Sequence, residues 1–65
     1  MSTHDFVGEG YKPENAQSAA NGQCDAWIAA QSPKIVEDGR KVLSLGQKPE
    51  DNIWECVLEL SYHSA

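Results

Sequence analysis

Basic side chains are scarce in this sequence. Five Lys and Arg stand against ten Asp and Glu, which gives a formal net charge of −5. Proteins that bind nucleic acids or anionic membranes do so mainly through clustered Lys and Arg. Only Arg40 and Lys41 are adjacent here. The composition therefore argues against nucleic-acid and membrane partners.

Long apolar runs are also missing. No run approaches the roughly 20 residues that a helix needs to span a bilayer. The segment from Met1 to Asp5 has neither the basic nor the apolar region of a secretory signal. We therefore expect a cytoplasmic protein without a membrane-spanning segment.

Cysteine occurs only twice, at Cys24 and Cys56, and no C-x-x-C pair is present. This excludes the usual zinc-ribbon and thiol-redox motifs. In a reducing cytosol both thiols are expected to be buried apolar side chains, and a disulfide between them is the alternative. With His4 and His63, which lie near the two ends of the chain, they could form a four-ligand site only if the fold gathered all four. Each residue is better explained singly, so we predict no metal site.

The 65 residues allow one domain, 1–65, without a linker or repeat. A chain of this size buries only about 60% of the surface that its unfolded form exposes. Its stability must be small unless a disulfide, a metal or self-association adds to the core.

The first half of the chain predicts a strand followed by a helix. Ser2–Tyr11 alternates in polarity, which favours a strand. Pro13 suits the first helical turn, and Pro33 forces the helix to end by the residue before it. The predicted helix, Pro13–Gln31, carries a stripe of Ala16, Ala20, Cys24 and Trp27, with Ile28 at its edge.

The second half predicts two further strands. Lys34–Gly39 is open to two interpretations, a short strand turning through Asp-Gly or a loop. A strand begins near Arg40 and runs to Gln47, and Lys48–Asn52 has the composition of a turn. Ile53–His63 shows the clearest alternation in the chain.

The order of these elements predicts an α+β fold of β-α-β-β type, with one helix packed on a three-stranded antiparallel sheet. The helix stripe should contact the face of the last strand that carries Trp54, Cys56, Leu58 and Leu60. The opposite face stays uncovered, and its apolar residues predict a self-association interface. That interface comprises Val7, Val42, Ile53 and Val57. Glu9, Glu55 and Glu59 are expected to be the solvated side chains of the same face.

The element order resembles that of the dodecins, small proteins that assemble into dodecamers and bind flavins between subunits. Gly10-Tyr11-Lys12-Pro13-Glu14 and Ile53-Trp54-Glu55-Cys56-Val57-Leu58 carry the resemblance. Dodecins place a tryptophan near the start of the second strand and a glutamine in the third to hold the flavin. Here Pro33–Glu37 has no aromatic residue, and Glu55 stands about where that glutamine would be.

Two functional hypotheses follow. The favoured one is a non-enzymatic domain that self-associates through its sheet and acts by protein binding. The alternative is a dodecin-like oligomer that binds a small aromatic ligand, such as flavin, between subunits. That site would comprise Trp27, Trp54, Glu55 and Tyr62. No phosphate loop, dinucleotide fingerprint or metalloprotease motif occurs, so we predict no catalytic residues.

Overall fold

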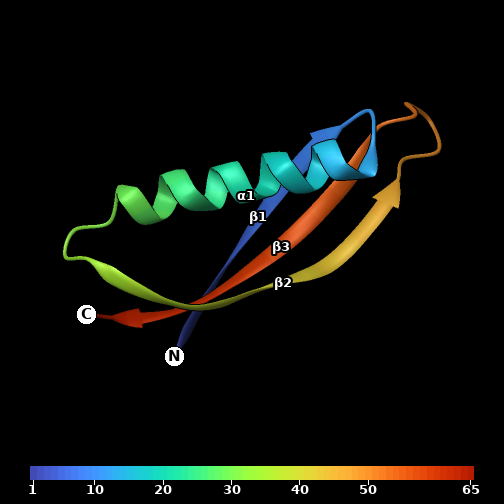
Figure 1. Ribbon diagram of the computed structural model, residues 1–65. Coiled ribbons are helices and arrows are strands. Elements are labelled where there is room, and N and C mark those ends of the chain that lie inside the picture. Colours follow the sequence, from blue (N-terminus) through green and yellow to red (C-terminus); the bar gives the residue numbers. More distant parts are fainter.

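A computed structural model describes residues 1–65 and shows one helix on a three-stranded antiparallel sheet (Figure 1). The fold class predicted from the sequence is confirmed. In chain order the elements are β1 (Ser2–Gly10), α1 (Pro13–Ala29), β2 (Ile35–Gln47) and β3 (Trp54–Ser64).

The last strand lies in the centre of the sheet, in the order β1-β3-β2. Val7 of β1 lies opposite Val57 of β3, and both point to the face that the helix does not cover. Phe6 lies opposite Leu58 on the helix side. Both β1 and β2 are therefore edge strands, each paired on one side only.

The helix begins where the sequence predicted and ends two residues earlier. Lys12 is extended, with φ −133° and ψ 153°, and Pro13 occupies the first turn, where its missing N–H is not needed. After Ala29 the Gln31 side chain donates a hydrogen bond of 3.0 Å to the Trp27 carbonyl oxygen. This bond satisfies one of the carbonyls that every helix end leaves without a helical partner.

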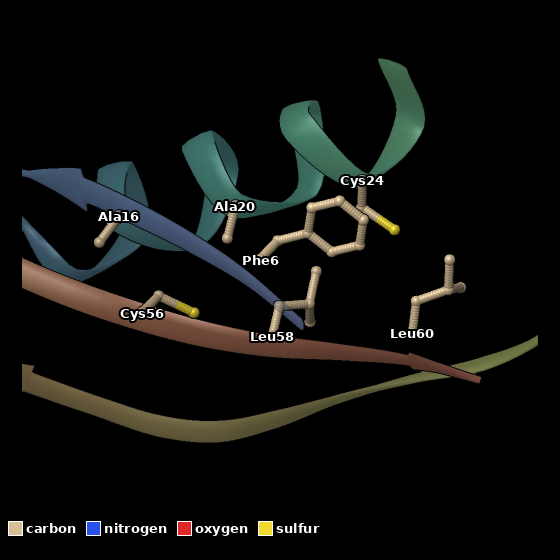
Figure 2. Close-up of a cluster of buried hydrophobic side chains, with 7 residues drawn as sticks. All are labelled: Phe6, Ala16, Ala20, Cys24, Cys56, Leu58 and Leu60. Carbon is tan, nitrogen blue, oxygen red and sulfur yellow. The ribbon is translucent and has the colours of Figure 1, made fainter. Parts of the chain in front are cut away.

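The core is a single layer between the helix and the β1–β3 pair (Figure 2). Three residues of the helix stripe are fully buried against three of the central strand, and β1 adds one aromatic ring. The seven buried hydrophobic residues are Phe6, Ala16, Ala20, Cys24, Cys56, Leu58 and Leu60. A core of this size is small even for a short chain, because it contains only three side chains larger than cysteine.

Gly8 determines how closely the helix approaches β1. A Cβ built on Gly8 would collide with the backbone nitrogen of Ala20 and the carbonyl oxygen of Ala16, and would lie 2.8 Å from the Ala20 Cα. Small residues on both elements therefore bring the two backbones together. The helix is held over β1 and β3 as a result.

The stretch that the sequence left open, Lys34–Gly39, belongs mainly to a strand, because β2 begins at Ile35. Asp38-Gly39 is not a hairpin turn. The register with β3 shifts between Glu37 and Gly39, so Asp38 lies in a bulge, where both its carboxylate oxygens are 2.9 Å from His63 Nδ1. The true turn follows Gln47 and ends at Asn52, which adopts a left-handed φ of 54°.

A second bulge changes which face each β2 residue occupies. The register shifts again between Val42 and Ser44, so Leu43 is the extra residue. Val42 lies opposite Leu58 and Leu45 opposite Cys56, both on the helix side of the sheet. The prediction that Val42 shares a face with Val7 and Val57 is therefore wrong, because a strict two-residue alternation does not survive a bulge.

The chain is elongated, with principal extents of 41 × 18 × 15 Å. Its radius of gyration is 12.7 Å, against about 10.7 Å for a compact domain of this length. Figure 1 shows the reason, since β2 curves away below the helix while α1 follows β1 and β3. Most of β2 is therefore left without a covering layer.

Replacing Gly8 by alanine should lower the free energy of unfolding by about 2 kcal/mol, because the new methyl group meets backbone that cannot rotate away. Gly22→Ala is the matched control. It lies at an exposed helix position with nothing within 4 Å of its built Cβ, and should stabilise by up to about 1 kcal/mol. Urea unfolding followed by circular dichroism measures both. Equal effects of the two substitutions would contradict the close approach of α1 to β1.

Candidate functional site

Two of the four predicted ligand-binding residues, Trp27 and Tyr62, do come together. Their rings meet edge to face with centroids 5.2 Å apart. The ring centroids of Phe6 and Trp27 are 5.8 Å apart. The His4 ring stacks on the indole of Trp27, with centroids 4.5 Å apart and an interplanar angle of 13°. This aromatic cluster ties the start of β1 and the end of β3 to the last turns of the helix. One face of the Trp27 ring is thereby covered by the chain itself.

The other two predicted ligand-binding residues lie elsewhere. Trp54 is at the opposite end of β3 from Tyr62, roughly 26 Å away at the usual rise of a strand. Glu55 lies on the uncovered face, opposite Glu9 and Gly46. The four residues therefore do not form one site within a single chain.

Glu55 belongs to a small ionic group at the end of the sheet near the β2–β3 turn. The Lys48 ammonium lies 2.6 Å from Glu9 Oε2 and 3.4 Å from Glu55 Oε2. The hydrogen bond from Lys48 to Glu9 raises the pKa of the lysine above its ordinary value. Lys48 thus separates two acids that face each other directly across β1 and β3.

A second ionic group is centred on Arg40 and joins β2 to the helix. The Arg40 guanidinium donates to Glu37 Oε2 at 2.7 Å, to Asn21 Oδ1 at 2.9 Å and to Asp25 Oδ1 at 2.5 Å. Hydrogen bonds to the Glu37 and Asp25 carboxylates raise the pKa of the arginine above its ordinary value. The hydrogen bonds that the Arg40 guanidinium donates are the main polar link between β2 and the helix.

The uncovered sheet face is acidic. Asp5 faces Glu59 across β1 and β3, and Glu9 faces Glu55. Val7 and Val57 lie between these two pairs of like charges. The described side chains contain no group of three or more metal-ligating residues close enough to hold an ion. The face that was predicted to be the interface is therefore a pair of valines enclosed by carboxylates.

Ile53, the fourth predicted interface residue, lies just before β3. Its carbonyl oxygen accepts a 2.8 Å hydrogen bond from the Lys48 backbone N–H, which closes the turn between β2 and β3. A shallow hollow of about 330 Å³ lies beside this turn. Its lining is Ser44, Leu45, Gly46, Gln47, Lys48, Pro49 and Glu55. With one apolar residue in that lining, the hollow lacks the apolar walls typical of small-molecule sites.

The sequence pointed to only one residue, Val42, of an exposed apolar strip on β2. Every residue from Lys41 to Gln47 is exposed. Val42, Leu43 and Leu45 are 43%, 44% and 36% exposed, so an apolar strip runs along an edge strand. The signal was present as an uncharged run, Val42–Gln47, within a predicted strand. We call this segment the bare half of β2.

Both cysteines are free and buried. Cys24 lies on the helix and Cys56 on β3, and Figure 2 shows them apart along the core, with Phe6 and Leu58 between them. Burial away from water raises the pKa of both thiols, which disfavours the reactive thiolate. The structure confirms the prediction of two buried thiols over a disulfide.

Comparison of the chain with protein families, with curated proteins and with solved structures finds no match. The helix of this fold is neither long enough nor apolar enough to cross a bilayer. The functional argument therefore depends on the surfaces just described.

The folded protein should react with Ellman's reagent only as fast as it unfolds, and the unfolded protein should release two thiols per chain without reductant. Folding raises the pKa of both thiols above their ordinary value of about 9. As the pH rises through that value, the thiols of the unfolded chain therefore ionise before those of the folded chain. The free energy of unfolding should therefore fall above that pH. The Cys24→Ala/Cys56→Ala double variant should show a smaller fall. Fewer than two thiols in denaturant would disprove the free-thiol state.

Proposed function

We propose that this chain is a small non-enzymatic assembly module, whose stable form is an oligomer of identical chains held together through β2. The observation that carries the proposal is the bare half of β2, where six consecutive strand residues, Val42–Gln47, are exposed and three of them are large and apolar. Contiguous apolar surface of this kind usually marks a protein interface.

The apolar strip continues the core rather than standing apart from it. Val42 and Leu45 lie opposite the buried residues Leu58 and Cys56, on the same face of the sheet. The helix covers that face over β1 and β3 but not over the bare half of β2 (Figure 1). A second chain against β2 would therefore extend one hydrophobic layer, which adds the stability that a core of seven residues lacks.

Charge favours this surface over the uncovered sheet face. On that face Asp5, Glu9, Glu55 and Glu59 form two directly opposed acidic pairs. Two identical copies packed through it would bring like charges together and desolvate them, which costs free energy. The bare half of β2 has no charged side chain to desolvate. We therefore propose that the interface lies on β2 and not on the face that carries Val7 and Val57.

The alternative function, flavin binding between subunits, requires an aromatic ring that is open to stacking. His4 stacks on one face of Trp27, and Phe6 and Tyr62 pack against the same ring at steep angles, so we take Trp54 as the tryptophan that a ligand would have to reach. Titration with riboflavin decides between the two functions. We expect unchanged tryptophan and flavin fluorescence, whereas mutual quenching that Trp54→Phe abolishes would establish the alternative.

Sedimentation velocity across a concentration series tests the proposed function. The wild-type chain should sediment at a multiple of 7.1 kDa at micromolar concentration. Leu45→Lys should raise the dissociation constant at least about tenfold, because it places an ammonium in an apolar contact. Val7→Lys, the matched control on the acidic face, should leave it unchanged. A wild-type mass of one chain at several hundred micromolar would refute self-association.

A further inference from the structure

The two edges of the sheet are protected to different degrees. The outer edge of β1 carries Asp5 and Glu9, and the Gln23 side chain donates a 2.8 Å hydrogen bond to the Val7 carbonyl oxygen. In β2 the charges gather in one half, at Glu37, Asp38, Arg40 and Lys41, while the bare half has none. Exposed edge strands without charge or covering pair readily with another strand.

The bare half of β2 also lies open to the close approach of another backbone. Its outer N–H and C=O groups have no strand beside them, because β2 is at the end of the sheet. The backbone is therefore available for β-augmentation, in which main-chain hydrogen bonds supply affinity.

We infer that two copies of this chain pair antiparallel along Val42–Gln47 and so join two three-stranded sheets into one of six strands. This inference rests on the proposed function and identifies the segment through which two copies would pair. An isologous pair brings the same segment from both copies together. Leu45 of each copy then lies beside the apolar strip of the other, and the two strips become one.

The charges at the two ends of the segment favour a second copy of this chain as the partner of β2. In an antiparallel pair, the residue before the segment in one copy meets the residues after it in the other. Lys41 precedes the segment. Lys48 follows it directly, and Glu50 and Asp51 follow in the turn. Lys41, Glu50 and Asp51 are exposed, and none of the three takes part in an ion pair within the chain. Lys41 of each copy would therefore meet Lys48 and two unpaired acids of the other copy.

The other cations near this contact are already occupied. Arg40 is bound by Glu37 and Asp25, and Lys48 by two carboxylates of its own chain. The turn with its neighbouring acids is therefore net negative even though it contains Lys48. Lys41 is the β2 cation that remains available to neutralise it.

A charge exchange tests this pairing in the full-length chain. Lys41→Glu should raise the dimer dissociation constant about tenfold, because each of the two symmetric contacts becomes repulsive. Glu50→Lys/Asp51→Lys should have a similar effect. The triple variant Lys41→Glu/Glu50→Lys/Asp51→Lys should return to within about threefold of the wild-type value. Lys34→Glu, which makes the same change of charge just before the start of β2 and outside the paired segment, is the control and should have no effect.

A mixed dimer of isotope-labelled and unlabelled chains gives an independent readout. Filtered NOE spectra should show contacts between the Leu45 methyl groups of one copy and β2 of the other. A dimer that lacks these contacts, or that the charge exchange fails to restore, would overturn the edge pairing while leaving self-association intact. A chain that stays monomeric would overturn both.

Discussion

The close approach of the helix to β1 is the constraint from which the rest of this structure follows. Gly8 removes the side chain that would separate the two backbones, and Ala16 and Ala20 complete a contact between small residues. The helix is thereby fixed above β1 and β3 (Figure 1). One helix of 17 residues cannot also cover a 13-residue strand that curves away from it. The exposed β2 is thus a direct result of how tightly the other two strands are covered.

The distribution of charge reinforces this asymmetry. The acidic residues of β1 and β3 gather on the uncovered face, where Lys48 neutralises part of one pair. Arg40 ties the charged half of β2 back to the helix through Asp25 and Asn21. The remaining half, Val42–Gln47, has neither charge nor cover. Solvation therefore keeps one face of the sheet free, while the exposed apolar residues of the bare half of β2 are the basis of the proposed interface.

The fold was predictable because its signals are local: a strand alternation in Ile53–His63, a proline at each helix boundary, and an Ala-rich stripe. The face of Val42 was not predictable, because a single inserted residue at Leu43 inverts the alternation and no local sequence signal marks it. The predicted ligand site combined three aromatic residues chosen by type with Glu55, which came from the resemblance to dodecins. The separation of Trp54 and Tyr62 along β3 follows from strand geometry. The stacking of His4 on Trp27, in contrast, depends on tertiary packing.

Amide hydrogen exchange measured at two protein concentrations tests the central claim most directly. If β2 is the surface that a second copy covers, the amides of Val42–Gln47 should gain protection as the concentration rises from a few micromolar to several hundred. The amides of β1 should gain only the protection that follows from the higher overall stability of the associated protein. Exchange in Val42–Gln47 that stays fast at every concentration would contradict the claim, and so would protection that appears on β1 instead.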